Sequence, residues 1–200
     1  MLKQIIEDMN DRIEALDIFE VIHPLCHQVQ RNTIDEETKE ITDTLEIFPA
    51  VYVSNGEFDN VAWDSQKSVC YCRRNGIVSV EENEDYEVGC EDAVSRTFPI
   101  KIVGLVFNCD TDDPYRDEKQ VENIIHAIQY KDNKALDIAL DLESIRVKII
   151  NYNTNRYEVV ANEFQNVELT VPFESIIFEL NIEIIIESET DCWENFDCGC

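Results

Sequence analysis

The stretch FESIIFELNIEIIIE, residues 173–187, has the clearest periodicity in the chain. Its even-numbered positions from 176 to 186 are all apolar, whereas its odd-numbered positions include Glu179, Glu183 and Glu187. Successive side chains of a strand point to opposite faces of a sheet, so this pattern predicts a strand with one apolar and one largely acidic face. At ~3.3 Å per residue it would extend roughly 50 Å, far enough to project from the body or to continue into the sheet of a neighbouring subunit.

Upstream of this strand, apolar patterns predict both helices and strands. Residues 98–108 are almost continuously apolar, which is typical of a central strand covered on both faces. Apolar residues at three- and four-residue steps predict an amphipathic helix over 2–20. The other predicted elements are a strand at 47–53, a helix at 114–130, a helical stretch at 135–142 and strands at 146–152 and 156–161. This order predicts an α+β fold, a mixed or antiparallel sheet with helices packed on one face.

The length of 200 residues predicts one α+β domain over 1–200. With only 5 Gly and 5 Pro, the chain has no linker rich in either residue. Residues 54–94 show weak periodicity and contain turn signals, so we expect an inserted loop or hairpin arm there rather than core. Residues 30–44 are polar and charged, which predicts an exposed loop or another hairpin arm. Residues 189–200 form a cysteine-rich C-terminal tail.

The charge balance excludes several classes of function. The chain has 16 Lys and Arg against 43 Asp and Glu, a formal net charge of −27. Proteins that hold nucleic acid neutralise phosphates with basic residues, and anionic membrane surfaces attract the same residues, so we expect neither partner to be bound. A hydrophobic content of 44% indicates a folded chain. We find no run of about 18 apolar residues and no signal-peptide pattern, and therefore expect no membrane association.

Eight cysteines raise the question of disulfides or metal. We expect reduced thiols, because the chain shows no secretory signal and is not a small stapled scaffold. Zinc is the alternative, since its ligand types occur in the chain. No Cys-x-x-Cys pair is present, however, and common zinc knuckles use that spacing. The residues of this alternative are His23, Cys26, His27, Cys70, Cys72, Cys192, Cys198 and Cys200.

The sequence contains no recognisable catalytic motif. The five glycines form no phosphate-binding loop, and neither Gly-x-Ser-x-Gly nor His-Glu-x-x-His occurs. A pair of catalytic carboxylates cannot be singled out among 43 acids. We therefore predict a protein that is not an enzyme, with no catalytic, cofactor-binding or metal-binding residue and no cofactor.

The order of elements resembles that of phage tail-terminator and related tail-completion or neck ring proteins. The resemblance covers 1–53 and 95–188: an N-terminal helix before a strand, a central apolar strand leading into a helix, and a long closing strand. It implies a virion structural protein, assembled in the host cytoplasm, that forms a homo-oligomeric ring in the neck or tail. It also implies neighbouring portal, neck or tail proteins as partners, with DNA passing through the ring without being specifically bound.

The acidic composition fits such a ring independently of the resemblance. A channel for DNA should not hold the duplex, and an acidic lining repels phosphates. Glu179, Glu183 and Glu187 are the candidate lumen-facing row, although a solvent-facing side of a sheet explains them equally well. Two other functions remain open. One is a small acidic protein that mimics DNA charge and blocks a basic or nucleic-acid-binding partner, and the other is a metal-dependent enzyme.

Overall fold

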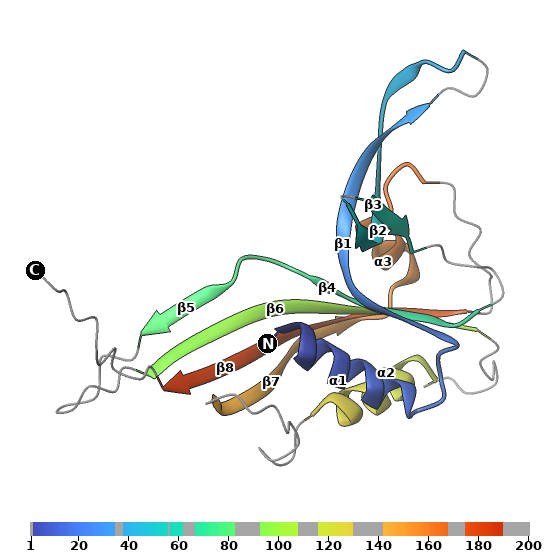
Figure 1. Ribbon diagram of the computed structural model, residues 1–200. Helices are drawn as coiled ribbons and strands as arrows, with labels where there is room; N and C mark the ends of the chain where they lie inside the picture. Colours follow the sequence, from blue (N-terminus) through green and yellow to red (C-terminus); the bar gives the residue numbers. More distant parts are fainter. Residues whose placement is uncertain are drawn as a thin grey trace, which may run out of the picture.

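The computed structural model describes residues 2–34, 38–55, 57–61, 67–82, 93–107, 116–129, 142–167 and 175–189. Within these ranges one eight-stranded sheet carries three helices (Figure 1). The strands are β1 (Val21–Ile34), β2 (Ile41–Ser54), β3 (Glu57–Asn60), β4 (Val69–Arg74), β5 (Ser79–Glu82), β6 (Ala93–Val106), β7 (Leu142–Asn153) and β8 (Ile176–Glu189). The helices are α1 (Leu2–Glu14), α2 (Arg116–Ile128) and α3 (Arg156–Glu163). This confirms the predicted α+β class.

The strands follow the order β3-β2-β1-β4-β6-β8-β7, and β5 pairs with β6 beyond the end of β4. The sheet is mixed: β1 and β4 run parallel, while the other paired strands are antiparallel. β6 and β8 pair along their whole length, from Ala93 opposite Glu189 to Val106 opposite Ile176. The long strand predicted at the end of the chain is therefore confirmed, and it lies inside the sheet rather than at its edge.

Helices α1 and α2 cover one face of the sheet and build the larger core with it. The even-numbered residues of β8, from Ile176 to Ile186, are all buried in that core. Helix α1 contributes Ile5, Met9 and Ile13 to this core, and each is fully buried. Helix α2 contributes three more fully buried side chains, those of Val121, Ile124 and Ile128. Helix α1 ends at Glu14, short of the predicted residue 20, because the chain turns there and Asp17 adopts a positive φ of 55°.

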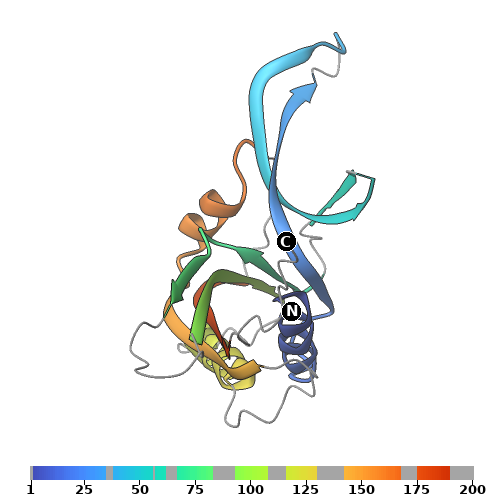
Figure 2. The same cartoon turned by 60° about the vertical axis from the view of Figure 1, so that its left-hand side comes forward.

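Helix α3 lies on the opposite face, as Figures 1 and 2 both show. The prediction of a strand at 156–161 is wrong, and so is the expectation that all helices share one face. The side chain of Asn155 caps this helix by accepting hydrogen bonds from the backbone N–H groups of Tyr157 and Glu158. Val159 and Phe164 then pack in a second core with Tyr71 and other residues of this face.

The described residues of 54–94, where an inserted arm is expected, contribute strands to the main sheet. They include β4, which pairs with β1 on one side and with β6 on the other. Five of its six residues are buried. In the described strand order β1 reaches the rest of the sheet only through β4, so β4 is a central strand of the fold. The projecting arm is formed instead by β1 and β2.

Parts of two predictions lie outside the described residues. Of the helical stretch expected at 135–142, only Leu142 is described, as the first residue of β7. Of the cysteine-rich tail at 189–200, only Glu189 is described, as the last residue of β8. Among the helices of the described ranges, none combines the length and apolar character needed to cross a bilayer.

Candidate functional site

The most distinctive surface feature is the hairpin of β1 and β2, called the arm below, which rises away from the body (Figures 1 and 2). Its strands pair from Cys26 opposite Val51 to Ile34 opposite Ile41. The body supports the arm as far as Leu45, whose carbonyl accepts a hydrogen bond of 2.8 Å from Asn166. This confirms the hairpin alternative for residues 30–44.

Contacts between its own two strands hold the arm together. Next to the supported position, Arg31 donates to Glu46 on the paired strand at 2.8 Å. Thr33 and Thr42 hydrogen-bond through their hydroxyl groups. The side-chain hydrogen bonds described near the tip join the two strands of the arm to each other.

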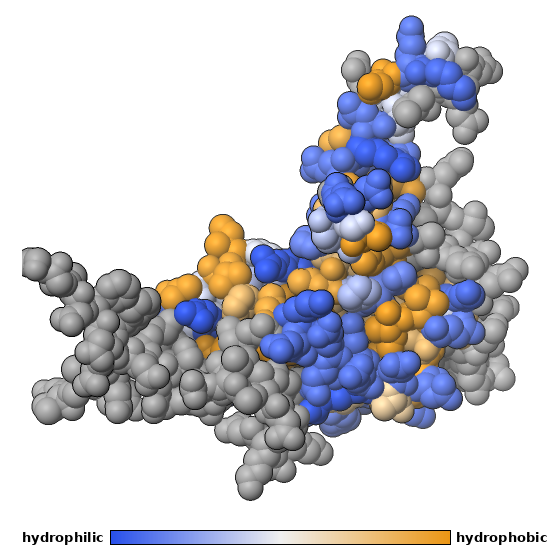
Figure 3. All heavy atoms as spheres, viewed as in Figure 1, coloured by the Kyte–Doolittle hydropathy of each residue, from blue (hydrophilic) through white to orange (hydrophobic). Residues whose placement is uncertain are grey.

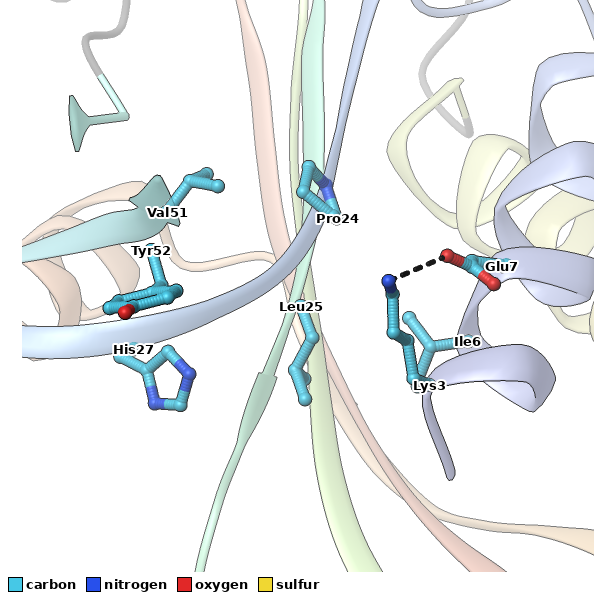
Figure 4. Close-up of a pocket in the computed structure, with 8 residues that line it drawn as sticks. All are labelled: Lys3, Ile6, Glu7, Pro24, Leu25, His27, Val51 and Tyr52. Atoms are coloured by element: carbon cyan, nitrogen blue, oxygen red, sulfur yellow. Dashed lines mark ion pairs between the residues drawn. The ribbon is translucent and has the colours of Figure 1, made fainter. Parts of the chain in front are cut away.

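A pocket of about 420 Å³ lies where the arm meets α1. Figure 4 shows α1 residues on one side of Leu25, with Tyr52 and other arm residues on the other side. An ion pair of 3.6 Å between Lys3 and Glu7 lies on the α1 side. Most of the lining is apolar, and the lining residues are Lys3, Ile6, Glu7, Pro24, Leu25, His27, Val51 and Tyr52.

Aromatic side chains stiffen the arm side of this pocket. The rings of Tyr52 and Phe58 meet edge to face, with centroids 5.4 Å apart. The ring of His27 meets Phe58 in the same manner at 6.0 Å. Edge-to-face pairs hold aromatic rings in defined orientations. The short edge strand β3, which carries Phe58, therefore fixes the wall formed by β1 and β2.

A cluster of buried charges lies beneath α3 on the second face of the sheet. Glu163 is fully buried and accepts hydrogen bonds from Arg73 at 2.7–3.0 Å and from the Tyr71 hydroxyl at 3.1 Å. Lys101 lies 3.4 Å from Glu163 and 2.7 Å from Glu179. Two cations thus meet two anions, which is the arrangement that buried charges require.

The environment of this cluster changes the pKa of its members. Burial raises the pKa of Tyr71, and the neighbouring carboxylate of Glu163 raises it further. Burial acts to lower the pKa of Arg73, but hydrogen bonding and attraction from Glu163 outweigh that effect and raise it. The tyrosine therefore stays neutral and the arginine stays charged. Both states suit a structural contact rather than proton transfer.

The candidate acidic row on β8 has lysine neighbours in the structure at two of its three positions. Glu179 is only 6% exposed and is neutralised by Lys101. Glu183 accepts a 2.9 Å hydrogen bond from Lys148 on β7. For Glu187 only the backbone is described, opposite Ser95 of β6. Two of the three residues of the row, Glu179 and Glu183, thus have a lysine of a neighbouring strand against them. Alternation within β6 and β7 was the signal in the sequence that could have revealed these partners.

The described cysteines are reduced and buried. Burial raises the pKa of Cys26 and of Cys72 to about 12, and it raises that of Cys70 well above 9.0. Burial also lowers the pKa of His23. In the part of the chain that the structure describes, no three His, Cys, Asp or Glu residues gather to hold a metal ion. The remaining residues of the zinc alternative in the tail, Cys192, Cys198 and Cys200, lie outside the described ranges.

The surface around the arm differs from the helix layer beside it. Figure 3 shows hydrophobic side chains where the arm meets the body, next to a hydrophilic surface over α1. The exposed charged residues of α1 and α2 include the acids Asp11, Glu14, Glu118 and Glu122 and the lysines Lys3 and Lys119. The arm, the pocket at its root and an acidic helix layer thus lie together on one molecule. A scan against protein-family models and a search of curated proteins find no match to this chain.

Proposed function

We propose that this chain is a structural protein of a virion that assembles with copies of itself into a ring of the phage neck or tail-terminator kind. In this proposal DNA passes through the ring, and portal, neck or tail proteins are its neighbours. Assembly takes place in the host cytoplasm. The arm formed by β1 and β2 is the observation that carries the proposal.

The arm supports assembly because an isolated two-stranded hairpin is at best marginally stable in water. Near the tip of this arm the described contacts join β1 to β2, and Ile41 is 71% exposed. Contact with another subunit would bury that side chain. A projecting element that meets a different surface on the next copy forms a heterologous contact, and such contacts close into rings when the rotation permits.

The distribution of charge supports passage rather than capture of DNA. The net charge of −27 repels a polyanion. Lys101 and Lys148 compensate part of β8, and Lys3 and Arg12 compensate Glu7 and Asp8 of α1. The exposed acids Asp11, Glu14, Glu118 and Glu122 are therefore the better candidates for a channel surface. An acidic helix layer of this kind would keep the duplex away from direct contact.

The buried charges support a structural role as well. Glu163, Arg73, Lys101 and Glu179 are paired with one another and enclosed beneath α3. A catalytic group needs access to a substrate, whereas these groups fasten a helix to a sheet. The described polar interior therefore favours a scaffold over an enzyme.

The proposal is tested by native mass spectrometry and negative-stain microscopy of the full chain. The samples span a range of protein concentration at low salt and at ~0.5 M salt, because salt screens repulsion between acidic subunits. We expect closed rings, with a larger assembled fraction at high salt. A monomer under all these conditions would overturn the proposal. A monomer that instead inhibits a nucleic-acid-binding protein would establish the DNA-mimic alternative.

Duplex DNA provides a second measurement. In an electrophoretic mobility shift at ~0.15 M salt, we expect the assembled protein to leave the duplex unretarded. Retention of duplex DNA at that salt concentration would contradict the proposed role, because each phosphate contact would slow passage through the ring.

A further inference from the structure

We infer that β3 of one copy pairs with β7 of the next copy and so continues the sheet from subunit to subunit. The inference rests on the proposed ring and names a contact that builds it. Strands β3 and β7 are the two ends of the strand order, so among the described strands each has a paired neighbour on one side only. The outer edge of such a strand offers backbone N–H and C=O groups to another strand.

The two edge strands carry opposite charges. Strand β3 reads EFDN, and all four of its residues are exposed, including the acids Glu57 and Asp59. Strand β7 carries Arg146 and Lys148, which are also exposed. Lys148 already binds Glu183 of its own chain, but this pair lies at the surface, with side-chain exposures of 60% and 30%. Because an ammonium group has three N–H donors, Lys148 can bind a second carboxylate as well.

The two strands match residue by residue when they pair antiparallel. In that register the segment EFD at 57–59 lies against the segment RVK at 146–148. Each acid of β3 then lies opposite a cation of β7, and Phe58 lies opposite Val147. Phe58 is 41% exposed, and Val147 is partly buried beside the larger core. Cross-strand pairs of opposite charge and pairs of apolar side chains both stabilise a sheet.

Both charged rows lie on the same face of the sheet. Arg146 and Lys148 are paired with odd-numbered residues of β8, whose even-numbered residues fill the core under α1 and α2. Asp59 lies opposite Val51, and Val51 lies opposite Cys26, which packs in the second core. Residues directly opposite each other in a sheet share a face. A sheet continued from β7 to β3 therefore brings the two rows together on the face that carries α3.

Strand direction permits a neighbour in the same orientation. Six pairings lead from β3 to β7 through the sheet, and among them only the pairing of β1 with β4 is parallel. Each of the other five reverses the direction, so β3 and β7 run in opposite directions. A second copy beside the first in the same orientation thus presents its β3 antiparallel to β7. This head-to-tail contact is heterologous, as a ring requires.

The same charges disfavour pairing of like edges. Two β7 edges would bring cations against cations, and two β3 edges would bring acids against acids, which destabilises a sheet. Length agrees with the mixed pairing, because β7 is regular over 144–149, between its two register shifts, and β3 has only four residues. The β3 strand of a second copy is therefore the occupant that charge, direction and length all favour.

One experiment reverses a charge on β3 in the full chain. Glu57→Arg is compared with Glu81→Arg, the same change at an exposed residue of β5, which also has four residues. We expect Glu57→Arg to raise the protein concentration for half-assembly by about tenfold or more, and Glu81→Arg to change it by less than about threefold. Addition of Lys148→Glu to Glu57→Arg should restore assembly, because opposite charges then face each other again. Thermal unfolding of the monomers shows that the variants fold.

A second experiment locates the contact. A chain with Glu57→Cys is mixed before assembly with a chain with Lys148→Cys, so that a disulfide between the two positions must join different copies. The Cα atoms of directly opposite residues in antiparallel strands are ~4.5–5.5 Å apart, within the reach of a disulfide. After mild oxidation we expect a link between positions 57 and 148, identified by mass spectrometry of the peptides. A mixture of Glu81→Cys with Lys148→Cys is the control and should give no link between positions 81 and 148.

The outcomes separate the inference from the proposed function. Rings that form equally well with Glu57→Arg, or assembled protein without a link between positions 57 and 148, overturn the pairing of β3 with β7 and leave the ring intact. If the unaltered chain never assembles, the proposed function fails and the pairing fails with it. The link between copies, together with recovery of assembly by Lys148→Glu, supports both.

Discussion

The guanidinium group of Arg73 binds both carboxylate oxygens of Glu163, with N–O distances of 2.7–3.0 Å, across 90 positions of the chain. Arg73 lies on the central strand β4, and Glu163 is the last residue of α3. This ion pair fastens α3 to the second face of the sheet. Because both side chains are buried, its removal should have larger consequences than that of any surface pair.

Replacement of one partner tests this role. Arg73→Met leaves the carboxylate of Glu163 buried with a weaker contact to Lys101, and we expect a loss of about 3–5 kcal/mol in the free energy of unfolding. Lys148→Met, which breaks the exposed pair with Glu183, should cost less than about 1 kcal/mol. Urea unfolding followed by circular dichroism measures both. A cost for Arg73→Met as small as that of the control would contradict the assigned role.

The close packing of Gly104 against Phe178 gives a second prediction. A Cβ atom at position 104 would lie 2.3 Å from the Phe178 ring, which is fully buried. We therefore expect Gly104→Ala to destabilise the fold by about 1–3 kcal/mol. The double change Gly104→Ala with Phe178→Leu removes the clash and should recover part of the loss. If Gly104→Ala alone unfolds at the urea concentration of the unaltered chain, the described contact is wrong.

The buried thiols predict resistance to alkylation. Since burial raises the pKa of Cys26 and Cys72 to about 12, almost no thiolate exists at these positions at pH 8.5. Peptides containing Cys26, Cys70 or Cys72 should remain unlabelled by iodoacetamide in the folded protein and become labelled in urea. Mass spectrometry reads the three sites separately. Equal labelling rates in both states would contradict their burial.

The same thiols make stability depend on alkaline pH. Their pKa is raised above 9.0, the ordinary value, so the folded state favours the protonated form. This contribution is fully present below pH 9 and is lost as the pH rises through the pKa of the folded state. We expect the urea midpoint to fall between pH 9 and pH 10.5. A Cys72→Ala variant should show a smaller decrease over the same interval.

His23 provides a prediction for acidic pH. Burial lowers its pKa below 6.5, so the folded state favours the neutral ring. Its contribution to stability is present above pH 6.5 and is lost as the pH falls through the pKa of the folded state. An NMR titration of the three histidines should give His23 a value below 6.5, and the assignment follows from His23→Gln. An ordinary value for His23 would contradict its half-buried position.

The sequence predicted the elements whose burial follows a simple period. Alternation identified β8, and three- and four-residue steps identified α1, because in each case one face meets the core. It failed at α3, where the β-branched and aromatic residues of RYEVVANE favour a strand. The cap from Asn155 and the packing of Val159 decide this segment instead. Tertiary contacts overrode local preference there.

The sequence also failed at β4 for a physical reason. Arg73 follows Tyr71 on the face that α3 covers, so a charged residue interrupts the apolar pattern of a buried strand. Its partner, Glu163, is 90 positions away and gives no local signal. The pocket could not be predicted either, because α1, β1 and β2 form it together only after folding. The arm is different, because the polar and charged residues at 30–44 predict a loop or a hairpin.

Strand β1 has a mechanical consequence. Its first half, from Val21 to Cys26, is bonded to β4 in the middle of the sheet, and its second half is one side of the arm. The arm is therefore not attached through a hinge loop. A force applied at its tip is transmitted through the backbone of β1 to the pairing between β1 and β4. It acts parallel to these strands, so several hydrogen bonds would have to break at the same time. A force that a neighbouring molecule applies to this hairpin would therefore reach the central strands of the sheet directly.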